Sequence, residues 1–175
     1  MHTAAIGKQG ELFVFGELLQ RGIVPYVPLV DMEGVDAIIR LDAGCYREIQ
    51  VKKLEKQKDV RWFQVRNLRA SEHLFIICVE RDDTVWVFPS RIFQKFATKS
   101  ETRSGIIYDL NLDGRSHGRG RTRKDLLAPY RNNWNLLIMA TEALDDLIAM
   151  YESMAAPEEE SLSLEQYKRL RAQSV

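Results

Sequence analysis

Hydrophobic positions along the N-terminal part of the chain predict one helix followed by a β-hairpin. Between residues 8 and 21, leucine and phenylalanine side chains recur at helical spacing, and Gly22 follows as a C-cap. Two prolines interrupt the apolar run 23–30, which restricts it to an edge or irregular strand. A short Asp-Ala-Gly turn separates the strand-like runs 34–41 and 45–53, and this arrangement is typical of a hairpin.

The middle of the chain predicts a helix, two strands and a second helix. Residues 60–69 carry apolar side chains at a spacing that is more helical than alternating. The nearly continuous apolar run within 73–80 predicts a strand covered on both faces. Residues 84–88 predict another strand, and a short helix follows over 89–96.

The C-terminal part predicts one more strand, over 105–112, then a loop and a long helix. Residues 114–124 are rich in Gly and Arg, include Ser116 and hold no apolar side chain, which favours a loop. Helical periodicity returns over 126–151, with Pro129 near the start, where proline is tolerated. The order of elements predicts an α/β fold, with a central mixed sheet flanked by helices and a long C-terminal helix.

Length and composition indicate a single soluble domain. The 175 residues predict a domain over 1–155, and then a linker with a short helical tail over 156–175. Lys plus Arg and Asp plus Glu both number 25, so the overall charge points to no partner. Two cysteines exclude a disulfide framework and a four-cysteine zinc site. No apolar stretch approaches about 18 residues, and no signal peptide is visible, so we expect a cytoplasmic location without membrane contact.

Polar side chains on the predicted hairpin could carry chemistry. Side chains two apart in a strand share a face, so Glu48, Gln50 and Lys52 lie on one face, and the hairpin brings Asp36 beside them at about 5 Å. Oxygen ligands next to a lysine are what metal-assisted phosphodiester cleavage requires. Glu11, in the preceding helix, could reach the same place. The alternative interpretation is an ordinary charged face on a half-solvated hairpin.

The motifs Gly7-x-x-Gly10-Glu11, Gly34-Val-Asp36 and Ile49-Gln50-Val-Lys52 occur in this order along the chain. In combination they resemble the PD-(D/E)XK nuclease superfamily, which has a restriction-endonuclease-like fold. The Gln-x-Lys variant is similar to that of a group I intron homing endonuclease and of Holliday-junction-resolvase-like proteins. The resemblance covers roughly residues 7–96, and residues 97–155 would form a C-terminal extension.

The resemblance implies a core of one helix, three strands, a second helix and a fourth strand. It also implies catalytic roles for Glu11, Asp36, Gln50 and Lys52, with Mg²⁺ as cofactor and Mn²⁺ as a substitute. Asp36, Gln50 and Glu11 would bind the metal, and Lys52 would act on the attacking water. The Gln50 amide brings no negative charge, so Glu11 or Glu48 would have to supply it.

Two basic segments could hold nucleic acid. From Lys52 to Arg69, seven basic residues stand against two acidic ones, a local net charge of +5, and residues 115–124 hold five basic residues and no acid. A solvated helix face and a mobile loop are the plain alternatives. The predicted DNA contacts are Lys53, Lys56, Lys58, Arg61, Arg115, Arg119, Arg121, Arg123 and Lys124.

These observations predict a metal-dependent DNA endonuclease that hydrolyses phosphodiester bonds and works as a homodimer or higher homo-oligomer. A catalytically inactive DNA-binding or partner-binding module of the same fold is the first alternative. An interaction protein unrelated to nucleic acid is the second.

Overall fold

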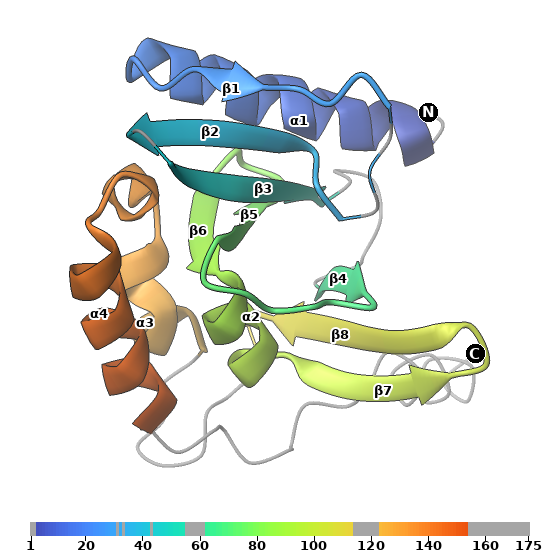
Figure 1. Cartoon of the computed structure of the whole chain (residues 1–175). Coiled ribbons are helices and arrows are strands. Elements are labelled where there is room, and N and C mark those ends of the chain that lie inside the picture. Colours follow the sequence, from blue (N-terminus) through green and yellow to red (C-terminus); the bar gives the residue numbers. More distant parts are fainter. Residues whose placement is uncertain are drawn as a thin grey trace.

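A five-stranded mixed sheet lies at the centre of the molecule, in the order β1-β2-β3-β5-β6 (Figure 1). Its strands are β1 (Pro25–Tyr26), β2 (Ala37–Asp42), β3 (Cys45–Lys53), β5 (Leu74–Val79) and β6 (Val85–Pro89). Neighbouring strands run antiparallel, apart from β3 and β5, which run parallel. The computed structural model describes residues 3–30, 32, 34–42, 44–54, 62–113 and 123–153. The predicted central mixed sheet is confirmed.

The strands of this sheet follow the hydrophobic pattern closely. β2 and β3 form the predicted hairpin, with Ala37 opposite Ile49, and β1 is the predicted short edge strand. All six residues of β5 are buried, as expected for a strand covered on both faces. The hydrophobic pattern therefore predicted the β2–β3 hairpin, the edge strand β1 and the buried strand β5.

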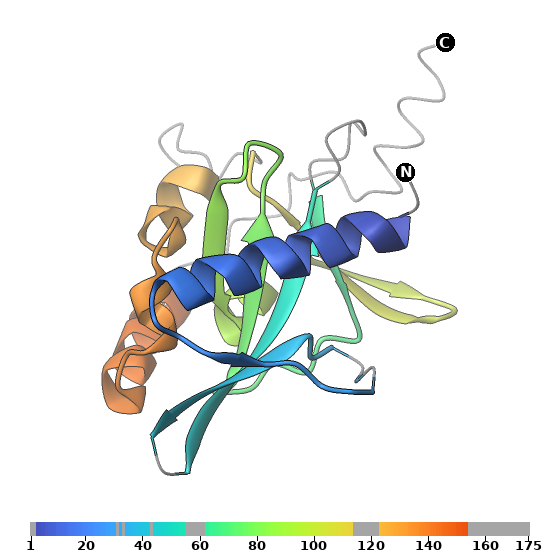
Figure 2. The ribbon, with the colours of Figure 1, turned by 90° about the horizontal axis from the view of Figure 1, so that it is seen from above.

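Helix α1 (Thr3–Gln20) crosses one face of the large sheet (Figure 2). It begins earlier than the predicted start at residue 8, and it ends before Gly22, whose φ of 73° confirms the predicted C-cap. Val14 and Leu18 are buried against the sheet. Gly10 marks the close approach to β3, because a Cβ at this position would lie 2.8 Å from the Cβ of Lys53.

A second, three-stranded sheet lies on the side of the large sheet away from α1 (Figure 1). It has the order β4-β8-β7, with β4 (Trp62–Arg66), β8 (Gly105–Asn111) and β7 (Thr98–Thr102). The predicted helix over 60–69 is therefore wrong. Trp62, Phe63 and Val65 are all buried, so both faces of β4 are covered and the alternation typical of a strand is lost.

The same strand corrects the order of elements implied by the family resemblance. A helix was expected between the third and fourth strands of the core, but the described part of that connection, residues 62–73, forms β4 and irregular backbone. Helix α2 (Ser90–Phe96), which follows β6, confirms the predicted short helix over 89–96.

The C-terminal region is helical but is not one long helix. It consists of α3 (Arg123–Leu127), two 3₁₀ helices (128–130 and 134–137) and α4 (Thr141–Ser153). Asn132 interrupts the predicted helix with a φ of 50°. Its backbone N–H donates to Val85 O at 2.7 Å, and its Oδ1 accepts from Val85 N at 3.0 Å. Pairing with the edge strand β6 therefore replaces helical hydrogen bonds at this point.

One hydrophobic core joins the two sheets and the helices. Val14 from α1, Phe75 from β5, Phe63 from β4 and Ile148 from α4 belong to the same buried cluster. Within the described part of the chain, no helix is long and apolar enough to cross a membrane.

Candidate active site

Asp36 lies immediately before β2, and its backbone and side chain both bond to β3. Its N–H donates to Ile49 O at 2.8 Å, and its Oδ2 accepts from Val51 N at 2.6 Å. The carboxylate thus takes the place of a backbone acceptor, and the regular β2–β3 pairing begins one residue later, at Ala37. Asp36 is therefore hydrogen-bonded to the residues on both sides of Gln50, Ile49 and Val51.

The polar side chains of β3 follow the predicted alternation. Glu48 and Gln50 line the same cavity on the face of β3 away from α1, and Gly34 lies beside the Gln50 amide. Gln50 is only 8% exposed. Gln50 and Asp36 are therefore neighbours across the start of the hairpin, whereas Glu48 lies one step further along the same face.

Glu11 approaches this site from α1. The helix packs against Val51 and Lys53 at Gly10, which brings the next residue, Glu11, to the hairpin. Glu11 forms an ion pair with Lys8, one turn earlier on the same helix. Lys8 was not predicted as a site residue, although its spacing of three from Glu11 is a signal for such a pair.

The charges around Asp36 act in opposite directions on its ionisation. Partial burial is the largest effect and raises the pKa of Asp36 above its ordinary value. The hydrogen bond from Val51 lowers the pKa, the Glu11 carboxylate raises it, and the nearby ammonium groups of Lys52 and Lys8 lower it. The net shift is upward, so the metal-free site disfavours the negative charge of Asp36.

Lys52 is half-buried on the same strand, opposite Cys78 of β5. Its ammonium group acts electrostatically on Asp36. Among the described residues it makes no hydrogen bond or ion pair, in contrast to Lys53, which pairs with Asp83 at 2.9 Å. The structure therefore brings Glu11, Asp36, Gln50 and Lys52 to one place, as the sequence predicts.

The donor set of this site suits a hard cation such as Mg²⁺. No hydrogen bond within the described chain engages Oδ1 of Asp36, and the Glu11 carboxylate is close enough to oppose its ionisation. A divalent cation would relieve that repulsion, and Mg²⁺ commonly uses only one or two protein carboxylates. Within the described residues, no group of three or more His, Cys, Asp or Glu side chains could hold a metal, so the protein donors of this site would be Asp36, Glu11 and the Gln50 carbonyl.

The predicted DNA contacts differ in their surroundings. Lys53 is engaged with Asp83 and lies over the ring of Phe13. Arg123 is only 3% exposed, so its guanidinium is inside the molecule rather than on its surface. The other predicted contacts, apart from Lys124, lie outside the described residues: Lys56, Lys58, Arg61, Arg115, Arg119 and Arg121.

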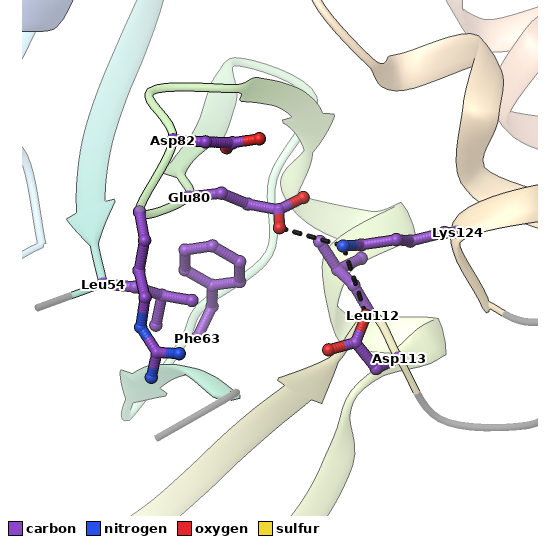
Figure 3. A pocket seen from close by; sticks show the side chains of 8 residues that line it. Leu54, Phe63, Glu80, Asp82, Leu112, Asp113 and Lys124 are labelled. Carbon is purple, nitrogen blue, oxygen red and sulfur yellow. Dashed lines mark hydrogen bonds and ion pairs between the residues drawn. The ribbon is translucent and has the colours of Figure 1, made fainter. Parts of the chain in front are cut away.

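Lys124 lies at a second cavity, of about 340 Å³, where β3 and β5 end (Figure 3). It forms ion pairs with Glu80 at 2.9 Å and with Asp113 at 3.2 Å. Partial burial opposes its charge, but these two hydrogen bonds raise the pKa of Lys124 overall. Lys124 is therefore engaged by two carboxylates at a partly exposed position.

Comparison with known proteins supports the fold. No family model and no curated protein sequence matches the chain. A solved structure of the bacterial homing endonuclease I-Ssp6803I is similar, with a TM-score of 0.54 and 20% sequence identity, over 83% of this chain and 98% of that one. The chain thus has an α/β fold similar to that of a nuclease.

Proposed function

We propose that the chain is a metal-dependent DNA endonuclease that hydrolyses phosphodiester bonds. The observation that carries the proposal is that Glu11 and Lys52 both act electrostatically on Asp36, which lies beside Gln50 at the start of one hairpin. The fold, which is similar to that of a homing endonuclease, is consistent with this chemistry.

Each side chain would have a separate task. Asp36, with the Gln50 carbonyl and Glu11, would hold a divalent cation, which when bound supplies charge stabilisation for the transition state. The ammonium group of Lys52 would orient the attacking water by a hydrogen bond and neutralise charge that develops on the phosphate oxygens. Val51 N–H fixes the orientation of the Asp36 carboxylate, because it binds one of the two oxygens.

A second candidate function follows from Gln50. An amide at a ligand position adds no negative charge, and among the described residues Glu11 is the carboxylate that acts on Asp36. A site of this kind would bind metal weakly, and a DNA-binding module of the same fold without cleavage activity is the alternative.

Incubation with supercoiled plasmid in Mg²⁺, Mn²⁺ or EDTA tests these proposals. The endonuclease should nick the plasmid with either metal but not in EDTA. Lys52→Ala should lower the rate by about 100-fold or more, since removal of one preorganised stabilising group typically costs this much. Lys99→Ala is the matched control, because Lys99 lies on β7 and pairs with Glu101.

The outcomes separate the two functions. Nicking by Lys52→Ala at the wild-type rate would contradict the site assignment. If the wild-type protein binds DNA but leaves the plasmid intact in both metals, the non-catalytic module is the better description.

A further inference from the structure

A cavity of about 380 Å³ opens on the face of β3 that carries Gln50. Glu48 and Gln50 line it from β3, and Gly34 and Val35, the two residues before Asp36, line it from the side. The cavity therefore shares Gln50 with the proposed metal site and is lined by the two residues that precede Asp36. Arg66 and Arg69 line it from β4 and the connection that follows.

Both arginines are exposed, and neither makes a hydrogen bond or ion pair with another described residue. Other basic side chains of the protein do engage carboxylates: Arg21 pairs with Glu17 at 2.8 Å and Lys53 with Asp83 at 2.9 Å. Within the described part of the chain, the guanidinium groups of these two cavity-lining residues are therefore available to an anionic ligand.

The backbone between the two arginines is hydrogen-bonded to the start of β8. Asn67 has a φ of 48°, its N–H donates to Ile106 O at 2.7 Å, and its Oδ1 accepts from Ile106 N at 3.0 Å. A Cβ at Gly105 would lie 2.2 Å from that Oδ1, so the contact requires glycine. Leu68 is buried beneath the same connection. Arg66 and Arg69 are thus presented from a well-anchored segment.

We infer that Arg66 and Arg69 form a subsite for a DNA backbone phosphate next to the one that is cut. The inference rests on the proposed function and adds the path of the strand, across β3 from Lys52 and Asp36 to the arginine pair. Guanidinium groups bind phosphate oxygens through paired hydrogen bonds, which suits a site that must fix the register of a strand.

The test is binding of a labelled duplex by fluorescence anisotropy in EDTA, at several salt concentrations. Arg66→Ala/Arg69→Ala should weaken binding and reduce the log–log salt slope by about 0.9 for each phosphate that the protein no longer neutralises. The matched control is Arg40→Ala/Arg131→Ala, which removes the same charge from exposed positions that do not line the cavity.

Two further variants sharpen the test. Arg66→Lys/Arg69→Lys should recover the salt slope but not the full affinity, because lysine keeps the charge and lacks the paired donors. Glu48→Gln should tighten binding, since it removes the negative charge that faces the same cavity. The lysine variant also provides the comparison if the alanine variant does not fold, as judged by circular dichroism.

The subsite is overturned if the arginine variants and the control bind alike, if Glu48→Gln weakens binding, or if the wild-type protein does not bind duplex DNA. Failure of the endonuclease proposal gives a different result: arginine-dependent binding in EDTA without cleavage in Mg²⁺ or Mn²⁺. Cleavage by wild type with control-like binding by the arginine variants refutes the subsite alone.

Discussion

Asp36 combines a structural and a chemical task in one side chain. One carboxylate oxygen accepts the Val51 N–H and so ends the β2–β3 ladder, while the other has no hydrogen bond within the described residues. Partial burial and Glu11 both disfavour its charge. The residue is therefore held in a position that is favourable for a bound cation and unfavourable for the metal-free protein.

This conflict predicts that Asp36→Asn abolishes cleavage and stabilises the metal-free protein at neutral pH. The raised pKa of Asp36 means that the folded state loses stability as the pH rises from the ordinary value of 3.8 through the raised value. Asparagine can still accept the Val51 hydrogen bond but never ionises. Thermal unfolding in EDTA should show a melting-temperature advantage of the variant that grows with pH over this window. A difference that is constant with pH would contradict the assigned cause.

Gln50 leads to a second prediction at this scale. Gln50→Glu should keep the geometry and tighten Mn²⁺ binding by about tenfold or more, because an added carboxylate strengthens the attraction for a cation. Glu48→Gln should change the affinity much less, since Glu48 lies one step further along the strand. Calorimetric titration compares them; the reverse order of effects would move the ligand assignment to Glu48.

The grouping of Asp36, Gln50 and Lys52 could be predicted because alternation along a hairpin fixes which side chains share a face. The effect of Lys8 on Asp36 could not be predicted, because it depends on how α1 crosses the sheet. The burial of Arg123 could not be predicted from the sequence either, because its neighbours in sequence are polar and the residues that cover it are distant in sequence.

At the scale of elements, the packing of α1 on β3 places Glu11 at the site. Gly10 permits this approach, because a Cβ would meet the Cβ of Lys53, an atom that the strand backbone holds in place. The pattern of the helix is visible in the sequence, but the reason for this glycine becomes clear only when the facing strand is known.

Gly10→Ala should therefore destabilise the protein by about 1–3 kcal/mol, as expected for overpacking. Gly7→Ala is the matched control, because nothing lies within 4 Å of a Cβ at Gly7. That control should stabilise α1 by about 0.5–1 kcal/mol through the lower backbone entropy of alanine. Denaturant unfolding measures both; equal effects of the two substitutions would refute the close contact as the cause.

The errors at this scale have a common origin in tertiary pairing. β4 is buried on both faces, so its sequence lacks the alternation of apolar and polar residues that is typical of a strand. β7 is polar and largely exposed, so its sequence has no apolar pattern that would predict a strand. The predicted helix over 126–151 is interrupted where Asn132 bonds to β6. In each case a distant strand, rather than local propensity, determines the conformation.

At the scale of the whole molecule, the two sheets share one hydrophobic core. Trp62 belongs to the small sheet, Trp86 to the large one, and Phe63 of β4 lies in the same cluster as Phe75 of β5. The cavity that holds the arginine pair is built from both sheets. The proposed phosphate subsite therefore depends on the packing of the two sheets against each other, whereas the proposed metal site lies on the large sheet and α1. The homo-oligomer and the C-terminal tail over 156–175 stay predictions.

A shared core predicts that both sheets unfold in one transition. Tryptophan-to-phenylalanine variants that retain only Trp62 or only Trp86 report on one sheet each. In each variant, the fluorescence unfolding curve should have the same midpoint as the far-ultraviolet circular dichroism curve. The circular dichroism curve also serves as the control for the overall stability of that variant. Fluorescence and circular dichroism midpoints that differ within one variant would indicate two independent folding units.

The hydrogen bond between the Val51 amide and Asp36 provides a natural spectroscopic probe. The Val51 N–H donates to the Asp36 carboxylate, with 2.6 Å between Val51 N and Asp36 Oδ2. The chemical shift of the Val51 amide proton in ¹H–¹⁵N spectra should therefore follow the protonation of Asp36 in a pH titration. The same resonance should move when a diamagnetic cation binds the free oxygen. Neighbouring strand amides, which donate to backbone carbonyls, provide the reference. A single backbone signal would thus report whether the carboxylate is protonated, charged or metal-bound, without a chromophore or an added label near the site.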